Sequence, residues 1–126
     1  KYYYFTDTPK QIIYRCDFNN ETGEIFNKVD YLKIEEGYPD GATIDSEGNL
    51  WWAMYGDGKI IKICTKDDQG KIIGEIKLPV QNPSSVAFGG EDLKTLFVTS
   101  ISYQPFFEKQ LEYPNGCLLG IDMAIY

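Results

Sequence analysis

The sequence predicts an all-β protein built from repeated, four-stranded antiparallel units. Short runs of β-branched and aromatic residues alternate with turn sequences rich in Gly, Asp and Asn, which is the pattern of successive hairpins. No stretch shows the 3.6-residue period of an amphipathic helix over ten residues or more. The chain has 126 residues, enough for one ordinary domain.

The strand pattern recurs with a period of about 47 residues. Residues 50–54 and 60–64 follow residues 2–6 and 12–16 at an offset of 48, and residues 96–100 follow 50–54 at an offset of 46. Four strands in a repeat of this length are typical of a β-propeller blade. A sandwich or meander whose repeat is accidental is the alternative.

The repeat divides the chain into three parts. Residues 1–36 end one blade, residues 37–80 form a complete blade, and residues 81–126 begin a further blade with an inserted loop at 102–116. In the complete blade, strands are expected at 41–44, 50–54, 59–64 and 71–78. Propellers need about 4–8 blades to close. We therefore expect the remaining blades from sequence beyond this chain, from another chain or from self-association.

Composition excludes several classes of function. Twelve basic residues against nineteen acidic ones give a net charge of −7, which argues against binding to nucleic acid or to an anionic membrane surface. The longest apolar runs are far shorter than the ~20 residues that span a bilayer. No histidine is present, so Ser-His-Asp and Cys-His catalytic systems and His-ligated zinc sites cannot be built from this chain. The three cysteines form no CxxC motif, and we expect a reducing, cytoplasmic setting.

One segment is more specific than the repeat. Residues 37–51 read G-Y-P-D-G-A-T-I-D-S-E-G-N-L-W. This segment resembles the pattern P-D-G-x-x-I-D-x-E-G-x-L-W of the family of regucalcin (senescence marker protein), gluconolactonase and luciferin-regenerating enzyme. The resemblance extends over roughly residues 2–101 and weakens after that.

This resemblance implies a fold and a chemistry. It implies a six-bladed propeller, of which this chain is the C-terminal half, with a single divalent metal on the central axis: Ca²⁺, or alternatively Zn²⁺, Mn²⁺ or Mg²⁺. It also implies hydrolysis of lactones. The family's metal ligands are a Glu of the first blade, an Asn of a middle blade and the Asp of the P-D-G motif. Only the last is present here, as Asp40.

The residues around Asp40 support a metal site on chemical grounds as well. Hard cations prefer oxygen ligands, which suits a chain without histidine. Pro39 restricts the backbone before Asp40, and Gly41 allows backbone or substrate to approach closely. The alternative is an Asp that caps backbone amides in a turn. The resemblance gives Asp40 two roles, metal ligand and catalytic base.

Two residues are expected to line the substrate pocket beside Asp40. One is Gly41, and the other is Ser84, which lies 44 residues after Asp40 at the equivalent position of the next blade. For Ser84 the alternative is a hydroxyl that bonds its own turn.

Three other features are interpreted as structural. Residues 45–49 superficially resemble a calcium loop, but their Gly stands at the fourth position instead of the sixth, so we predict a β-turn. Trp51 and Trp52 are adjacent on a strand, so their side chains are expected on opposite faces. Cys16 and Cys64 share a repeat position at the offset of 48 and are expected in equivalent core positions, not in a disulfide.

The sequence therefore predicts a divalent-metal-dependent hydrolase of sugar lactones or related small esters. Two alternatives remain open. One is a non-catalytic propeller that binds calcium or a protein partner, because a fold does not dictate a function. The other is the processing of a luciferin-type specialised metabolite. The role of loop 102–116, as a lid over the site or a cover for a sheet edge, also remains open.

Overall fold

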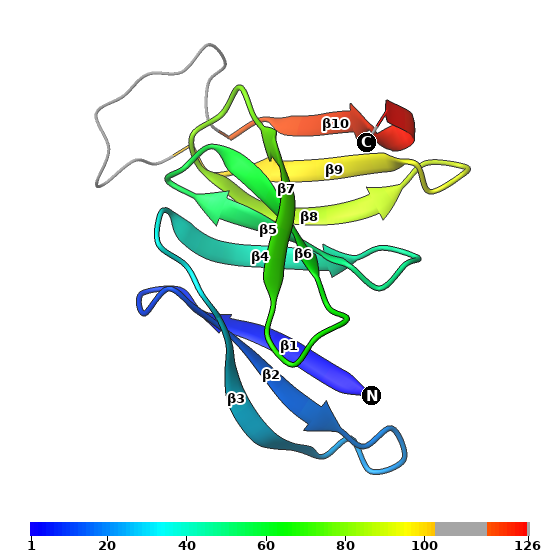
Figure 1. The fold of residues 1–126 in the computed structure, drawn as a ribbon. Coiled ribbons are helices and arrows are strands. Elements are labelled where there is room, and N and C mark those ends of the chain that lie inside the picture. Colours follow the sequence, from blue (N-terminus) through cyan, green and yellow to red (C-terminus); the bar gives the residue numbers. More distant parts are fainter. Residues whose placement is uncertain (103–115, 126) are drawn as a thin grey trace.

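The computed structural model describes residues 1–102 and 116–125 (Figure 1). These residues form three antiparallel sheets that follow one another along the chain. The first sheet contains β1 (Tyr2–Asp7), β2 (Ile12–Phe18) and β3 (Ile25–Lys33). The second contains β4 (Tyr38–Ile44), β5 (Leu50–Tyr55), β6 (Lys59–Cys64) and β7 (Lys71–Lys77). The third contains β8 (Pro83–Gly89), β9 (Thr95–Ser100) and β10 (Leu118–Asp122), and a short 3₁₀ helix, Met123–Ile125, follows it.

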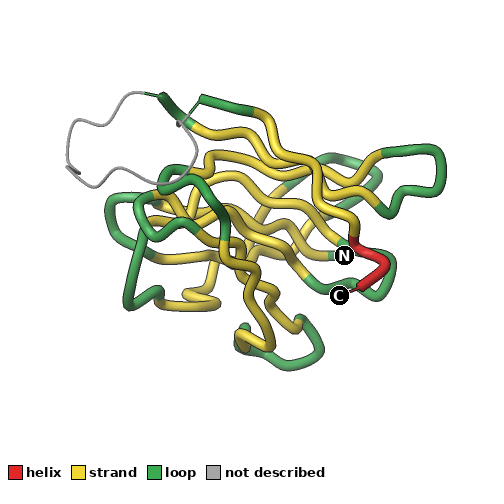
Figure 2. The backbone as a smooth tube through the Cα atoms, turned by 90° about the horizontal axis from the view of Figure 1, so that it is seen from above, coloured by secondary structure: helices red, strands yellow, loops and turns green. Residues whose placement is uncertain are grey.

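Every sheet is a simple meander in which sequential strands pair with each other. The strand orders are β1-β2-β3, β4-β5-β6-β7 and β10-β9-β8. Seen from above, the turns lie at the ends of the strands (Figure 2). The prediction of an all-β, antiparallel chain is confirmed, and no α-helix occurs among the residues that the structure describes. The same residues contain no helix with the length and hydrophobicity that a membrane span requires. Most of the inserted loop predicted at 102–116 lies outside the described residues.

Side chains between neighbouring sheets form two hydrophobic clusters. The cluster between the first and second sheets contains Ile13, Tyr31, Ile34, Leu50, Trp52, Met54, Ile61 and Ile63. The cluster between the second and third sheets contains Trp51, Ala53, Ile60, Ile76, Val86, Leu96 and Val98. Trp51 and Trp52 belong to different clusters, which confirms that they point to opposite faces of the second sheet. Burial of each large apolar side chain stabilises the stack by roughly 1.5–3 kcal/mol.

The spacing of equivalent residues in the first two sheets is 47, so the predicted offset of 48 is wrong by one residue. Ile13 packs against the second sheet, and Ile60, 47 positions later, packs in the same way against the third. At an offset of 48 the partner of Ile13 would be Ile61, which packs back against the first sheet. A slip of one residue moves a side chain to the opposite face of a sheet.

The corrected offset changes the interpretation of the cysteines. Cys16 is equivalent to Ile63, not to Cys64. Cys16 is buried and Cys64 is only half-buried, so the two do not occupy matching core positions. The prediction that they form no disulfide is confirmed, because the structure leaves both thiols free.

The first strand of the second sheet begins earlier than expected. The sequence predicts it from residue 41, whereas β4 begins at Tyr38 because Tyr38 pairs with Tyr55 and Pro39 with Met54. Proline is tolerated there because this strand lies at an edge of its sheet. Asp40 therefore lies inside a strand.

Candidate functional site

Asp40 occupies a β-bulge near the beginning of β4. Pro39 pairs with Met54 and Ala42 pairs with Trp52, so Asp40 and Gly41 together oppose one residue of β5. A bulge interrupts the ladder and redirects the side chain of the extra residue. The local sequence therefore places the Asp40 side chain outside the regular alternation of the strand.

The Asp40 carboxylate is half-buried and has no partner among the residues that the structure describes. Burial raises the pKa of Asp40, because the charged form loses hydration that no hydrogen bond replaces. The alternative, an Asp that caps backbone amides, is not what the structure shows. A desolvated carboxylate without a donor is instead available to a cation or to a proton.

The backbone around Asp40 is held by side chains. The indole Nε1 of Trp52 donates to the carbonyl oxygen of Asp40 at 2.7 Å. Thr8 Oγ1 donates to the carbonyl oxygen of Pro39 at 2.8 Å. These bonds fix the peptide groups on both sides of the Asp40 α-carbon.

Gly41 lies against the first strand of the next sheet. A Cβ atom at Gly41 would lie 2.4 Å from Ser85 Oγ and 2.8 Å from the carbonyl oxygen of Ser84. No side chain fits into that space, so glycine lets β4 and β8 approach each other. The close backbone approach that the sequence predicted at Gly41 is therefore made by β8. Its contact with substrate stays a prediction.

Ser84 occupies the position in the third sheet that Asp40 occupies in the second. Pro83 pairs with Ser100 and Ser85 with Thr99, so Ser84 also lies in a bulge directly after a proline. Its Oγ lies 2.9 Å from Thr99 Oγ1, and either atom can be the donor. The hydroxyl thus bonds the neighbouring strand β9 and not its own turn. Its role in a substrate pocket stays a prediction.

The described residues fit one part of a metal site. A calcium ion takes 6–8 oxygen ligands, and Asp40 offers one anionic oxygen donor without a competing partner. No group of three or more Cys, Asp or Glu side chains that could hold a metal ion occurs in residues 1–102 and 116–125. Asp40 therefore fits as a single ligand, and further donors would have to come from elsewhere.

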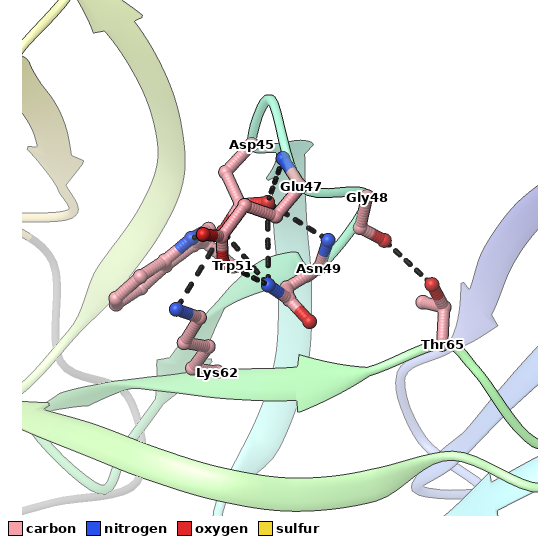
Figure 3. A network of polar contacts seen from close by, with 7 residues as sticks. All are labelled: Asp45, Glu47, Gly48, Asn49, Trp51, Lys62 and Thr65. Atoms are coloured by element: carbon pink, nitrogen blue, oxygen red, sulfur yellow. Dashed lines mark hydrogen bonds and ion pairs between the residues drawn. The ribbon is translucent and has the colours of Figure 1, made fainter.

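The opposite end of β4 holds a second aspartate in a very different setting (Figure 3). Asp45 Oδ1 accepts hydrogen bonds from the backbone N–H groups of Glu47 and Asn49 at 3.0 and 2.9 Å. Its Oδ2 accepts from Trp51 Nε1 at 2.9 Å and lies 3.7 Å from Lys62 Nζ. Burial alone would raise the pKa of Asp45, but the bonds from Trp51, Asn49 and Glu47 outweigh it and lower that pKa. The predicted β-turn at 45–49 is confirmed.

Comparison with known proteins indicates the same family as the P-D-G motif. Residues 1–102 match the model of the SMP-30/gluconolactonase/LRE-like region. The chain belongs to this family. A 6-deoxy-6-sulfogluconolactonase of Pseudomonas putida is 35% identical over 120 residues, which cover 93% of this chain and 40% of that protein. The chain spans about two-fifths of the length of three curated relatives that it matches.

Two solved structures share the fold. A luciferin-regenerating enzyme superposes with a TM-score of 0.83 at 35% identity, covering 91% of this chain and 39% of that one. A calcium-binding protein, regucalcin, from Agrobacterium tumefaciens superposes with a TM-score of 0.70 at 30% identity, covering 77% of this chain and 33% of that one. The prediction of β-propeller blades is thereby confirmed.

Sequence reasoning missed two polar residues near the site. Thr8 and Gln11 lie in the turn between β1 and β2. Their side chains reach the carbonyl groups of Pro39 in β4 and of Gly37 directly before β4, 31 and 26 residues later. Neither residue stands in a motif, and their contacts depend on how the first sheet packs against the second. The single sequence contains no signal for such a contact.

Proposed function

We propose that the protein containing this chain is a divalent-metal-dependent hydrolase of sugar lactones or related small esters, and that Asp40 is one of its metal ligands. The observation that carries this proposal is the bare, half-buried Asp40 carboxylate in the bulge of the P-D-G motif. A desolvated carboxylate destabilises a fold unless a cation or proton compensates its charge. The lactonase and calcium-binding relatives support the same chemistry.

The bound divalent cation would supply Lewis acidity toward the carbonyl oxygen of the substrate. Asp40 would be one of the residues that hold that cation. Asp40 is also proposed as the base that accepts a proton from the attacking water. Gly41 and Ser84 are proposed to line the substrate side of the same pocket.

The rest of the metal site is proposed to come from other propeller blades, either beyond this chain or in another chain. β4 and β8 contact each other, as the close approach at Gly41 shows. We propose that these first strands face the propeller axis, where ligands from several blades surround one ion. The second candidate function is calcium binding without catalysis, which the regucalcin relative favours.

The test uses the full-length protein and D-glucono-δ-lactone. We expect hydrolysis to stop when EDTA removes the metal and to return with Ca²⁺, Zn²⁺, Mn²⁺ or Mg²⁺. Asp40→Ala should lower turnover about a thousandfold or more, because several kcal/mol of transition-state stabilisation depend on the metal. It should also weaken metal binding. The control is Asp68→Ala, which removes a fully exposed carboxylate that pairs with Arg15 at 3.7 Å.

Two results would change the assignment. Undiminished hydrolysis by Asp40→Ala would refute the role of Asp40. Calcium binding by the wild-type protein without any turnover of lactone would favour the non-catalytic function.

A further inference from the structure

Three carbonyl groups at the beginning of β4 or directly before it accept hydrogen bonds from side chains. The Gly37 oxygen accepts from Gln11 Nε2 at 2.8 Å, and the Pro39 oxygen accepts from Thr8 Oγ1 at 2.8 Å. The Asp40 oxygen accepts from Trp52 Nε1 at 2.7 Å. Two of the three donors therefore lie in the β1–β2 turn of the first sheet, which β2 and β3 separate from β4 along the chain.

The turn that carries Thr8 and Gln11 is itself firmly held. Gln11 N–H donates to the Thr8 carbonyl at 3.1 Å, and the Gln11 carbonyl accepts from Ile34 N–H at 2.8 Å. Gln11 has a φ of 56°, in the left-handed region that residues other than glycine rarely adopt. Such a conformation persists only where the surrounding structure enforces it, and it is concentrated near functional sites.

Since Asp40 lies in a bulge, its backbone is released from part of the regular strand ladder. The peptide groups before it then need other partners to keep one orientation. The hydroxyl of Thr8 and the amide of Gln11 supply those partners from outside the sheet. A carboxylate on a backbone held in this way keeps one direction without any hydrogen bond of its own.

We infer that Thr8 and Gln11 are positioning residues, which aim the Asp40 carboxylate by fixing the carbonyl groups of Pro39 and Gly37. The inference rests on the proposed role of Asp40 as a metal ligand. Thr8 and Gln11 touch neither metal nor substrate, so their effect is exerted through the backbone of β4. The preceding sheet thus contributes to the site of the next one.

A purely structural role would tie the two sheets together without influencing the ligand. The chain offers a matched control for this alternative. Thr6 Oγ1 donates to the Ile12 carbonyl at 2.8 Å, within the same β1–β2 hairpin, and does not reach β4. Thr6→Val and Thr8→Val each remove one half-buried hydroxyl bond to a carbonyl, but only Thr8→Val frees the carbonyl of Pro39.

The experiment measures Ca²⁺ affinity by calorimetry on the full-length protein, for wild type, Thr6→Val, Thr8→Val and Thr8→Ser. We expect Thr8→Val to weaken Ca²⁺ binding about tenfold, as loss of a supporting partner of a metal ligand does. Thr8→Ser keeps the hydroxyl and should stay close to wild type, as should Thr6→Val. Melting temperatures check that the two valine variants are folded and comparably stable.

Amide hydrogen exchange of Asp40 and Gly41 in the metal-free protein is the second measurement. Faster exchange in Thr8→Val than in Thr6→Val, together with weaker Ca²⁺ binding, supports the inference. Equal behaviour of the two valine variants in both measurements overturns it. Unchanged Ca²⁺ affinity in Thr8→Val also overturns it if Asp40→Ala abolishes binding. If Asp40→Ala leaves Ca²⁺ affinity unchanged, the proposed function fails. Faster amide exchange in Thr8→Val than in Thr6→Val would then still support the conclusion that Thr8 fixes the backbone of β4.

Discussion

Asp40 and Asp45 stand five residues apart at the two ends of β4, and their carboxylates have opposite surroundings. Asp45 accepts hydrogen bonds from two backbone amides and an indole, and these bonds lower its pKa. Asp40 accepts none from the described residues, and burial raises its pKa. At Asp40 the surrounding side chains bond the backbone instead of the carboxylate.

This difference distinguishes Asp45, a structural carboxylate, from Asp40, a carboxylate that is available to a ligand. The Asp45 network closes a turn and orients Trp51, whose ring packs between the second and third sheets. The bonds around Asp40 hold its position but leave its charge uncompensated. An uncompensated charge costs stability, so its retention is understandable where a ligand supplies the missing interaction.

Substitution of a glycine by alanine is expected to have the most different effects on lactone turnover at the two ends of β4. A Cβ at Gly41 would collide with Ser85 and with the Ser84 carbonyl, so Gly41→Ala forces β4 and β8 apart. We expect a loss of about 1–3 kcal/mol in unfolding free energy and a loss of about a hundredfold in lactone turnover, because displacement of a catalytic group by about 1 Å has such an effect.

Gly48 provides the comparison. Its φ is 86°, and a Cβ there would meet only Thr65 Oγ1 at 3.8 Å. Gly48→Ala therefore strains the backbone by roughly 1–2 kcal/mol without moving Asp40, and turnover should be unchanged. Chemical denaturation and a lactone assay on both variants check the contrast. Equal losses of turnover would show that the beginning of β4 has no special role.

Asp45→Asn is expected to have an intermediate effect. The asparagine amide would direct a donor at the indole N–H of Trp51, or leave that buried donor without an acceptor. The expected cost is about 1–3 kcal/mol of unfolding free energy. Turnover should stay within about twofold of wild type, because Asp45 lies at the far end of the strand from Asp40. A hundredfold loss of activity in a folded Asp45→Asn variant would contradict the distinction drawn between the two carboxylates.

The sequence predicted the strands and the motif but missed the register by one residue. The reason lies in β5, where Leu50, Trp51, Trp52, Ala53 and Met54 are all buried. A strand that is covered on both faces loses the alternation of polar and apolar residues that reveals which side chain faces which way. Repeats aligned by residue type alone can therefore slip by one, as the offset of 48 did.

The candidate site was predictable only where it is local. Pro39, Asp40 and Gly41 are consecutive, so the motif alone singles them out. Thr8 and Gln11 reach β4 only because two sheets stack, and no pattern in the sequence marks that contact. The sequence therefore predicts which residues form the motif, but it does not predict the hydrogen bonds that hold the motif in place.

The smallest expected effect is a dependence of stability on pH at Asp40. Because burial raises the pKa of Asp40, the ionised form is less favourable in the folded chain than in the unfolded one. The carboxyl group's contribution to stability is therefore complete below the unfolded pKa of about 3.9. It is lost as the pH rises through the higher folded pKa.

An asparagine amide at position 40 stays neutral, so it does not lose stability as the pH rises. Without metal, Asp40→Asn should melt slightly above wild type at pH 7, and the difference should disappear near pH 3. Melting curves in EDTA at the two pH values test this, and an Asp40→Asn variant that is less stable than wild type at pH 7 would show that the carboxylate has a partner in the fold. Asp45→Asn should behave in the opposite way, destabilised at pH 7 and approaching wild type as acid protonates Asp45, because hydrogen bonds lower the pKa of that group. The sign of the two differences therefore tells which carboxylate the fold itself satisfies.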